Sequence, residues 1–565
     1  LARSVALPRR SLCGRSTALH RILSCRPPPQ SFAALLRLHG GTPAFAVQRR
    51  VAARQAAIVP EAESASLSLD GRPRSALGAL RLLARAFALG LLLLRPLLLL
   101  LPALLLRGRA WQSRFERALV HALERGGPCL TKLGQWASTR PDVLPASLCA
   151  TLGELHSRVE PHALELSRAA ISASFGATAP AEELLGSLSA APLGSGCIAQ
   201  VHRATVGGVP LAVKVLHPHV ERQVADDLYL LRGACGAFEL LLSPLLPGLR
   251  WLALPQMVDE FAAFMRSQLD LRLEARNLDA FRANFAVDPR VEVPRPLREE
   301  GLVARRVLVE TLLPGQTLSS LLEEDAAAAE GEAAALLAAD EAAAEAMQAA
   351  GMGAASSADA SAAVRAAAEL EARGAAREAR RSELARLGLR TFLTMVLRHN
   401  FVHADLHPGN ILVLPAGGEG GGGGAGEVRL GIIDAGLVVE LTERDRRNFL
   451  SLFKAIGQGD GELAGDLMLR HAREQRCDDP AAFRRGMRNL VESARAGERG
   501  AFNLRHLKVG EVLLEVTSLV RTHHVQPDPV FTTLVCAIVV LEGLGRQLDP
   551  TLDLFSVGLP LLVGA

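Results

Sequence analysis

Apolar residues recur along this chain with two different periods. Over residues 111–161 and 219–285 they return every three or four positions, which is the spacing of helices packed on a core. The sequence Pro-Asp-Val-Leu-Pro at 141–145 divides the first of these stretches into two helical segments. Residues 193–217 alternate instead and contain short β-branched runs, and 303–311 repeat that strand pattern. The expected order is therefore helices, a small sheet with inserted helices, and more helices.

Two stretches are of low complexity. Residues 323–381 consist mostly of Ala and Glu and contain no aromatic residue. Because Ala favours the helix but offers little area to bury, we expect a solvated, partly frayed helix there. Residues 417–426 are nearly all Gly and predict a flexible loop between two strands. Near the C-terminus, Glu542 and Arg546 interrupt an apolar run, which indicates a core helix and not a membrane span.

The most apolar segment is AFALGLLLLRPLLLLLPALLL at 86–106. Its 21 residues suffice to cross about 30 Å of hydrocarbon as a helix. Arg95 costs on the order of 2.5 to 3.5 kcal/mol on insertion scales, which so many leucines can offset, while Pro96 and Pro102 weaken the pattern. We expect residues 81–110 to associate with a membrane as a single span or an embedded hairpin. The alternative is a buried helix that covers the folded domain.

Charge is distributed unevenly along the chain. Residues 1–110 hold 17 Arg, no Lys and three acidic residues, a balance of +14 within a net charge of +4. The rest sums to −10 and offers no general basic surface, so nucleic acid is not an expected partner. The first 50 residues contain nine Arg, five Ser and no Asp or Glu, which is typical of transit peptides. We therefore expect residues 1–60 to direct import into a mitochondrion or a plastid, with a disordered basic tail as the alternative.

The most informative motif is FVHADLHPGNILV at 401–413, followed by LGIIDAG at 430–436. An Asp and an Asn five residues apart on a loop, with a second Asp after an apolar strand, is how phosphoryl-transfer enzymes place a carboxylate and two metal ligands. In this interpretation Asp405 faces the acceptor hydroxyl, while Asn410 and Asp434 hold Mg²⁺, which prefers hard oxygen ligands. The alternative is a turn capped by Asp and Asn side chains.

A second motif is the upstream strand VPLAVKV. Alternation points Lys214 the same way as Ala212, and a Lys in this position reaches nucleotide phosphates when an acid from a neighbouring helix holds it. Glu274, in LDLRLEARNL, is the candidate acid. Either charge alone would pass for a surface residue. Their order relative to the two later Asp residues, however, matches a two-lobed kinase.

A loop of small residues, PLGSGCIAQVH, precedes that strand. Gly194 and Gly196 allow backbone amides to approach phosphates, and Ser195 lies between them. Ala199 replaces the third glycine of a G-x-G-x-x-G pattern. These four residues, together with Lys214, are the expected binding set for ATP or ADP.

Histidine and cysteine residues form no obvious metal site. His399, His403 and His407 are regularly spaced, but their segment is a loop with a proline, so the three side chains need not share a face. We expect His403 to brace the catalytic loop and His407 to be structural. The eight cysteines are scattered without paired spacing, which predicts neither zinc ligation nor a disulfide framework.

With Lys132-Leu-Gly-Gln135 placed upstream, these motifs resemble the UbiB family of atypical kinases, also called aarF-domain-containing kinases. Lys-x-Gly-Gln, a small-residue loop ending in Ala-Gln-Val-His, Ala-Val-Lys-Val, Asp-Leu-x-x-Glu-Ala-x-Asn and His-Ala-Asp-Leu-His-Pro-Gly-Asn all occur in the family's order. The resemblance covers residues 111–565 outside the low-complexity inserts. KLGQWASTRPD and the unusual Asp-Ala-Gly are most similar to the second animal-type, mitochondrial branch.

The resemblance implies an α+β, two-lobed protein-kinase-like fold with a helical N-terminal extension over the active site. By position it makes Lys214 and Glu274 the ion pair, Asp405 the catalytic-loop acid, and Asn410 and Asp434 the Mg²⁺ ligands. The family is linked to coenzyme Q and other isoprenoid-lipid metabolism, with ATP binding or hydrolysis better supported than protein phosphorylation. An organellar membrane lipid and proteins of the coenzyme Q pathway are the partners it implies.

The family also implies a specific arrangement of the extension. Its Lys-x-Gly-Gln residues, here Lys132 and Gln135, enter the cleft where a protein substrate would otherwise lie. The usual Glu-x-Asp reads Gln268-Leu-Asp270 here, which leaves Asp270 as the one carboxylate of that motif to pair with Lys132. Two further departures are glycines in the nucleotide loop, where much of the family has Ala, and Ala435 in place of Phe.

The resulting domain organisation has six parts. These are a transit peptide at 1–60, a hydrophobic segment at 81–110, a helical extension at 111–190, an N-lobe with inserted helices at 191–320, the low-complexity insert at 323–381 and a C-lobe at 382–565. The leading function is a membrane-associated, ATP-dependent kinase or ATPase of a mitochondrion, with a plastid as the alternative. The second is a nucleotide-binding pseudokinase scaffold that organises a lipid-synthesis complex. A small-molecule kinase rests on the catalytic loop alone.

Overall fold

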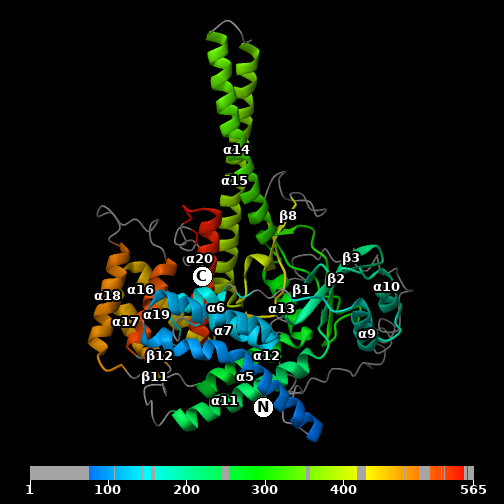
Figure 1. Ribbon diagram of the computed structural model, residues 1–565, viewed down its shortest axis with the longest axis vertical. Helices are drawn as coiled ribbons and strands as arrows, with labels where there is room; N and C mark the ends of the chain where they lie inside the picture. Colours follow the sequence, from blue (N-terminus) through cyan, green and yellow to red (C-terminus); the bar gives the residue numbers. More distant parts are fainter. Residues whose placement is uncertain are drawn as a thin grey trace, which may run out of the picture.

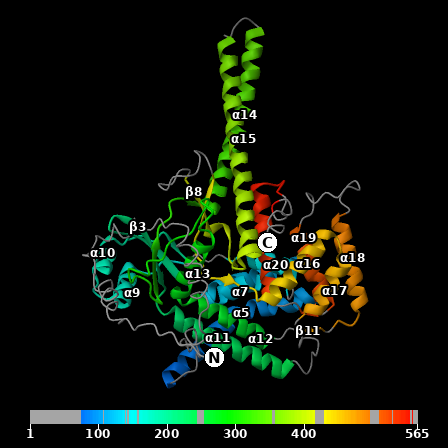
Figure 2. The same cartoon turned by 180° about the vertical axis from the view of Figure 1, so that it is seen from behind.

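The computed structural model describes residues 75–106, 108–138, 140, 144–153, 155, 159–242, 254–351, 357–415, 428–472, 474–475, 477–495, 509–523, 525–526, 529–552 and 557. The expected transit peptide at 1–60 and the glycine-rich loop at 417–426 lie outside these residues. The described chain forms two lobes side by side, and a long helical hairpin rises from between them (Figure 1). The same arrangement is visible from behind (Figure 2).

The smaller lobe is built on an antiparallel sheet in the order β1-β2-β3-β5. Its strands are β1 (Gly194–Ser195), β2 (Ala199–Val206), β3 (Val209–Leu216) and β5 (Val307–Thr311). One face of the sheet packs against α9 (Leu164–Phe175) and α10 (Ala179–Ser187). Leu211, Val213 and Val215 of β3 are fully buried in this small core. The other face of β3 is therefore free to form the cleft.

Three helices separate β3 from β5 in the sequence. They are α11 (Val220–Leu242), α12 (Leu254–Gln268) and α13 (Leu271–Asn284). Asp270 caps α13, because its side chain accepts a hydrogen bond from the Arg272 backbone N–H at 3.1 Å. The buried stripe of α13, which includes Glu274, faces β5 and the main hydrophobic core.

The larger lobe contains a second four-stranded sheet and a group of helices. The sheet order is β4 (Val291–Glu292), β9 (Arg429–Ile432), β8 (Ile411–Leu414) and β6 (Gln316–Thr317), with β4 and β9 parallel. Short pairs join β7 (Val402–His403) to β10 (Val438–Val439) and β11 (Glu474–Gln475) to β12 (Val525–Gln526). The helices are α16 (Glu443–Gln458), α17 (Gly461–His471), α18 (Pro480–Arg495), α19 (Val509–Thr522) and α20 (Pro529–Leu548). Ile538, Leu541 and Leu544 of α20 are buried in the core, as its interrupted apolar run predicts.

The low-complexity insert forms two helices and not one. The helices are α14 (Leu318–Gly351) and α15 (Ser357–Thr394), which pack along each other and project from the body (Figure 1). Their outer parts contribute little to the core, whereas Leu321 and Leu384 at their inner ends are buried in it. The insert is therefore anchored at its base.

In the part of the chain that the structure describes, four helices precede the smaller lobe. They are α5 (Ala76–Leu105), α6 (Arg109–Arg125), α7 (Pro128–Ser138) and α8 (Ala146–Gly153). Helix α5 begins at Ala76, before the expected hydrophobic segment, and runs through both of its prolines. α7 and α8 are separated at the Pro-Asp-Val-Leu-Pro stretch, as expected. The mixed helix and strand content and the two lobes confirm the α+β, kinase-like fold class.

Helix α5 has two different faces. Leu82 and Pro96 belong to a stripe turned toward the body, and α5 packs mainly on α6. The other face exposes large apolar side chains, Leu77, Leu80, Leu83, Phe87, Leu91, Leu94, Leu97, Leu98 and Leu101. The window of α5 around Ala76–Ala103 is long and apolar enough to cross a membrane and is only 6% buried, a test of length and composition alone.

Candidate active site

Lys214 lies at the centre of the cleft. Because its neighbours on β3 are buried in the small core, Lys214 points toward α13. Its Nζ donates hydrogen bonds to Glu274 Oε1 at 2.7 Å and Oε2 at 2.9 Å. The same Nζ lies 3.0 Å from Asp434 Oδ2. The structure thus brings together three residues that are far apart in the sequence. Glu274 follows Lys214 by 60 positions, and Asp434 follows Glu274 by 160.

The ionisation of these groups follows from burial and from their mutual attraction. Burial lowers the pKa of Lys214, but Asp434 and Glu274 outweigh it and hold that pKa above its ordinary value. Burial raises the pKa of Glu274 to about 7, against the opposing effect of Lys214. Burial also disfavours the ionised form of Asp434, yet Lys214 keeps the pKa of that carboxyl well below its usual range. Asp434, with 43% of its side chain exposed, is the carboxylate that remains charged and accessible to a cation.

Asp434 is held in a strained backbone conformation. Its φ of 60° lies in the left-handed region, which residues other than Gly rarely adopt. Gly436 N donates to Asp434 Oδ1 at 3.1 Å, and His403 Nε2 donates to the Asp434 carbonyl at 2.6 Å. Asn277 Nδ2 on α13 donates to the Ala435 carbonyl at 2.8 Å. Strain of this kind persists where surrounding contacts impose it, commonly at functional sites.

The catalytic loop is organised around His403. Asp405 N donates to His403 Nδ1 at 3.2 Å, so Nε2 carries the hydrogen that reaches Asp434. Burial lowers the pKa of His403, which keeps this neutral tautomer. Asn410 Nδ2 donates to the Asp405 carbonyl at 2.9 Å, which leaves the side-chain oxygen of Asn410 for a cation. His403 therefore braces the loop, as expected, by linking the segments of Asp405 and Asp434.

The other two histidines of this segment have structural roles. His407 Nδ1 accepts from Gly409 N at 3.0 Å and caps the short 3-10 turn Pro408–Asn410. His399 ends a π-helical turn, Met395–His399, and its ring packs edge-on against Phe285. Each of the two histidines thus has a local structural contact, and their regular spacing does not by itself indicate a metal site.

Helix α7 brings Lys132 to the catalytic loop. Lys132 Nζ lies 4.0 Å from Asp405 Oδ2, and 13% of the lysine side chain is exposed. Burial lowers the pKa of Lys132, but Asp405 and other acidic groups outweigh it and raise that pKa overall. A side chain at Gly134 would collide with Leu155, so glycine permits the close approach of this helix. Lys132 therefore occupies the cleft, as the resemblance implies.

The partner expected for Asp270 is wrong. Among the described residues, the carboxylate that pairs with Lys132 is that of Asp405, whereas Asp270 pairs with Arg272 at 2.6 Å and caps α13. A short-range cap therefore satisfies Asp270. Gln135 Nε2 donates to the Leu155 carbonyl at 3.1 Å.

Gln268 lies against the segment of Asp434. A Cβ placed on Gly436 would come within 2.9 Å of Gln268 Nε2. Gln268 is therefore beside the Asp-Ala-Gly turn.

The two glycines of the small-residue loop leave open space where a side chain would lie, and neither has the positive φ that would require glycine. A Cβ on Gly194 would meet nothing within 4 Å, and one on Gly196 would be 3.6 Å from the Ala199 carbonyl. Gly196 N donates to that carbonyl at 2.9 Å, and Ser195 Oγ is buried without a hydrogen-bond partner among the described residues. Cys197 is buried here too, and burial raises the pKa of its thiol. The loop is thus closed on itself, with room on its outer side.

A chain of histidines supports this loop from behind, and the sequence does not suggest it. His217 Nε2 donates to the Gly196 carbonyl at 2.7 Å, so its Nδ1 must accept from His162 Nδ1 at 2.8 Å. His162 Nε2 then accepts from Ser167 Oγ at 2.9 Å. His202 adjoins Ser167 at 3.1 Å. Burial lowers the pKa of all three histidines, that of His162 to about 4.

One acidic residue of the cleft also escapes sequence reasoning. Glu310 lies on β5, 9% exposed, and its Oε2 has no partner among the described residues. Burial raises the pKa of Glu310 to about 8, and nearby Glu274 adds to the rise. A charged residue inside the apolar strand VLVET was the available signal.

The residues present fit Mg²⁺ and a nucleotide triphosphate. Asp434 and Asn410 offer oxygen ligands on facing segments, and Lys214 offers an ammonium for phosphate oxygens. The cleft carries the carboxyl groups of Asp405, Asp434, Glu274 and Glu310 against two lysines. This excess of acidic groups is the kind of environment that a divalent cation neutralises.

Comparison with known proteins agrees with this geometry. Residues 154–466 match the model of the ABC1 atypical kinase-like domain, and residues 501–553 match the UbiB helical domain. The chain belongs to the ABC1/UbiB family of atypical kinases. The Lys-x-Gly-Gln helix α7 lies upstream of the matched domain. Membership of the second animal-type branch stays a prediction.

Curated relatives of this family occur in eukaryotes and bacteria. The probable serine/threonine-protein kinase abkC of Dictyostelium discoideum is 28% identical over 85% of this chain and 68% of its own length. The mitochondrial ABC1 family protein C21C3.03 of Schizosaccharomyces pombe is 29% identical over 88% and 73%. The probable protein kinase UbiB of Shewanella loihica is 30% identical over 78% and 68%.

Proposed function

We propose that this ABC1/UbiB kinase hydrolyses ATP with Mg²⁺ at a mitochondrial membrane, in coenzyme Q or related isoprenoid-lipid metabolism. The observation that carries the proposal is the position of Lys214, between Glu274 and Asp434 and opposite the loop of Asp405 and Asn410. The mitochondrial relative in fission yeast supports a mitochondrion over a plastid, and the Arg-rich first 50 residues support import into an organelle. The bacterial UbiB relative supports the metabolic setting.

The chemistry follows from what each side chain can do. Lys214, oriented by Glu274, would hold phosphate oxygens and exchange its contact with Asp434 for them. Asp434 and Asn410 would bind Mg²⁺, which supplies positive charge to neutralise the transferred phosphoryl group. Asp405 would accept a hydrogen bond from the attacking water or alcohol and take its proton. Lys132 Nζ, 4.0 Å from Asp405 Oδ2, would add positive charge beside the reacting groups.

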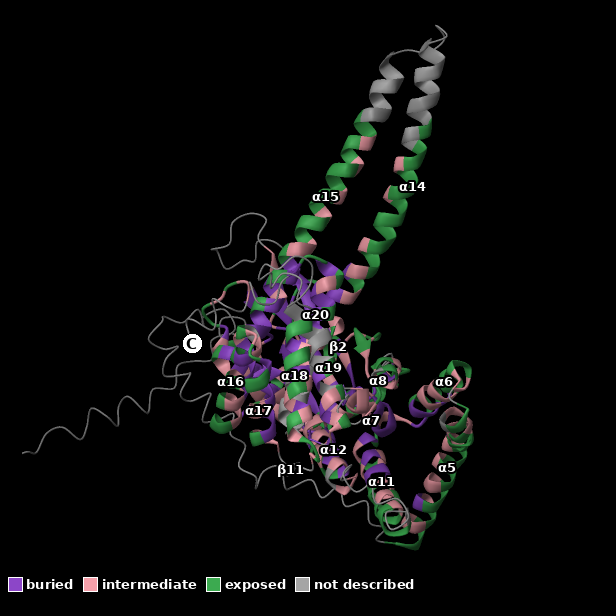
Figure 3. Ribbon diagram, turned by 90° about the vertical axis from the view of Figure 1, so that its left-hand side faces the viewer, coloured by how far each residue is buried: buried purple, intermediate pink, exposed green. Residues whose placement is uncertain are grey.

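Helix α5 supports contact with a membrane. Ten large apolar side chains of α5, the nine named above and Leu105, form an exposed surface of a kind that marks membrane or protein contacts. Figure 3 shows α5 at the edge of the molecule. We place α5 along the lipid surface, because its N-terminal half is fastened to α11 by Arg81 and Arg85.

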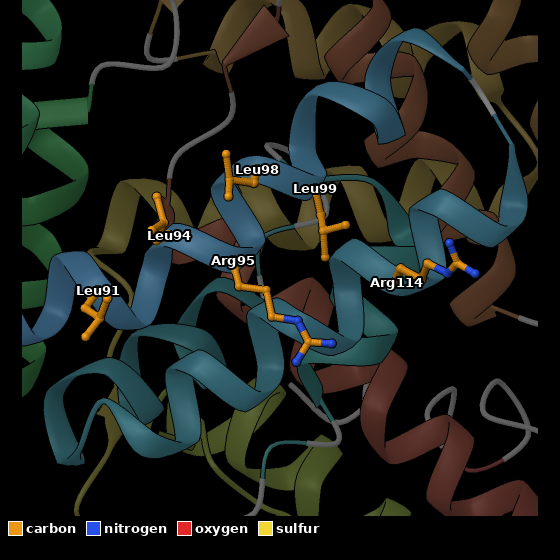
Figure 4. Close-up of a pocket in the computed structure, with 6 residues that line it drawn as sticks. All are labelled: Leu91, Leu94, Arg95, Leu98, Leu99 and Arg114. Carbon is orange, nitrogen blue, oxygen red and sulfur yellow. The ribbon is translucent and has the colours of Figure 1, made fainter.

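A shallow cavity of about 470 Å³ between α5 and α6 fits this placement. Four leucines of α5 line it together with Arg95 of α5 and Arg114 of α6, both exposed (Figure 4). Arginines beside an apolar wall are suited to the boundary between acyl chains and phosphate headgroups.

The membrane contact is tested by liposome flotation of the full chain. Leu97→Glu and Leu101→Glu together should reduce the bound fraction severalfold, because the two residues are 64% and 62% exposed on the apolar face. Leu166→Glu is a matched control, since Leu166 is 47% exposed on α9 of the smaller lobe. Equal flotation of all three proteins would remove the membrane from the proposal.

A nucleotide-binding scaffold without turnover is the second candidate. The observation in its favour is Lys132, which occupies the cleft beside Asp405. Such a protein would bind Mg²⁺-ATP and release no phosphate.

Phosphate release by the full chain in liposomes separates the two functions. An ATPase requires turnover that falls at least about 100-fold in Asp405→Asn and in Asp434→Asn, because both remove charge at the reacting phosphoryl group. Asp259→Asn, a surface change on α12, should leave turnover unchanged. Tight Mg²⁺-ATP binding with no phosphate release would establish the scaffold. Turnover that survives in Asp434→Asn would contradict the metal assignment.

A further inference from the structure

Glu310 is a buried carboxyl group that phosphoryl transfer does not explain. On β5, Val307 and Val309 are buried in the small core, so Leu308 and Glu310 face the opposite side, toward α13. Leu308 pairs with Lys214 and Glu310 pairs with Ala212 in the sheet register. Glu310 therefore shares the cleft face of the sheet with Lys214.

The position of Glu310 along β5 separates its side chain from the proposed phosphate site at Lys214. Residues on the same face of a strand are about 6 to 7 Å apart, so Glu310 lies one such step from the strand position of Lys214. The step leads toward residues 312–315, through which β5 joins the larger lobe. A nucleotide whose phosphates contact Lys214 and Asp434, as proposed, can extend its base to this side of the cleft. Ala212, which is opposite Glu310 in the sheet register, has a small side chain.

An unpaired carboxyl oxygen in such a place indicates a ligand. Glu310 is 9% exposed, and its Oε2 has no hydrogen-bond partner among the described residues. Burying a polar atom without a partner destabilises the folded chain, so a group that supplies the missing hydrogen bond is favoured. Lys214 does not supply it, because its contacts are with Glu274 and Asp434.

We propose that Glu310 accepts a hydrogen bond from the 6-amino group of adenine and thereby selects ATP among nucleotides. The inference rests on the proposed function, since it concerns the same nucleotide site. Lys214, Glu274 and Asp434 are the charged groups that face Glu310. A carboxyl group retains an acceptor oxygen whether or not it is protonated, so the contact does not depend on its ionisation.

The test compares ATP with purine riboside triphosphate, which lacks the 6-amino group. The full chain in detergent with Mg²⁺ should bind ATP about tenfold or more tightly than the analogue. Glu310→Leu should bring the ratio of the two Kd values close to one. Glu310→Gln, which keeps a side-chain oxygen, should retain the preference. The Tm of the nucleotide-free Glu310→Leu protein should be unchanged or higher, because an unpaired buried carboxyl has been replaced by an apolar group.

Glu300 offers a matched control. It is also buried in the smaller lobe with an unpartnered Oε2, but its other oxygen pairs with Arg295 at 2.8 Å. Glu300→Gln should leave the ratio of Kd values unchanged. Equal binding of both nucleotides by the unmodified protein, or a preference that persists in Glu310→Leu, would overturn the inference while leaving the ATP site in place. Absence of binding by either nucleotide would overturn the proposed function as well.

Discussion

Two sets of ion pairs hold distant parts of this chain together, and they differ in charge balance. In the cleft, Lys214 contacts both Glu274 and Asp434, and Glu310 lies nearby without a partner for one oxygen. At α5, each arginine has one aspartate: Arg81 pairs with Asp226 at 3.0 Å and Arg85 with Asp227 at 2.7 Å.

This difference in charge balance distinguishes a candidate binding site, the cleft, from a structural contact, the ion pairs between α5 and α11. Both arginines at α5 form two parallel hydrogen bonds to their carboxylates, which satisfies both charges within the protein. The cleft instead retains more acidic groups than basic ones, an arrangement that costs stability until a ligand with positive charge or hydrogen-bond donors completes it. Acidic groups that lack a partner therefore indicate function, whereas balanced ion pairs indicate structure.

The largest effect is expected in the cleft. Lys214→Met should reduce Mg²⁺-ADP affinity and ATP hydrolysis by about 100-fold or more. The substitution removes the ammonium group that Glu274 orients and that would hold the phosphate oxygens. Lys454→Met, on the exposed side of α16, is the matched control and should bind ADP normally. Equilibrium binding of a fluorescent ADP reports the result, and unchanged affinity in Lys214→Met would refute the cleft assignment.

Breaking the ion pairs between α5 and α11 should lower the free energy of unfolding and leave ADP affinity unchanged. Asp227 is fully buried, so Asp227→Asn leaves Arg85 without its charge partner and should cost about 3 to 5 kcal/mol in unfolding free energy. Asp226→Asn should cost less, because 39% of the Arg81 side chain is exposed. Urea unfolding measures both. Because both ion pairs satisfy their charges within the protein, each variant should bind ADP with unchanged affinity. A large loss of ADP affinity would contradict a purely structural role for these pairs.

The histidine chain behind the nucleotide loop should make stability depend on pH. The folded-state pKa of His162 is lowered to about 4 from 6.5, so the unfolded chain binds more protons between these values. The unfolding free energy should therefore fall as the pH decreases from about 6.5 toward 4, by up to about 1.4 kcal/mol per pH unit. His162→Gln should reduce this slope in denaturation curves recorded at several pH values. A slope identical to that of the unmodified protein would show that His162 does not titrate in this range.

The smallest effect is expected from the helical hairpin, in whose described residues neither kind of cluster occurs. Many of these residues are exposed, and an ion pair between the two helices joins Arg377 and Glu332 at 2.6 Å. Replacement of residues 336–373 by a short glycine-serine linker should change the unfolding free energy by less than about 0.5 kcal/mol. ATP hydrolysis should also persist. A loss of more than about 2 kcal/mol would show that the hairpin contributes to the core.

The candidate residues for phosphoryl transfer could be named from the sequence because each lies in a short motif. Asp405 and Asn410 share one loop, and Lys214 lies in an alternating strand whose two faces can be read from its apolar positions. Periodicity likewise predicted the order of helices and strands. The expected partner of Asp270 was wrong, because Arg272, two residues away, competes for its carboxylate.

The sequence by itself determined the class of fold, the motifs of the cleft and the extreme apolarity of the segment that became α5. Only the tertiary structure decided which charges meet. Asp227 is 142 positions from Arg85, and Glu310 faces the cleft only through its register with β3. Local patterns record helix and strand periods because these repeat within a few residues. Contacts between distant segments depend on how whole elements pack, and no short stretch of sequence contains that information.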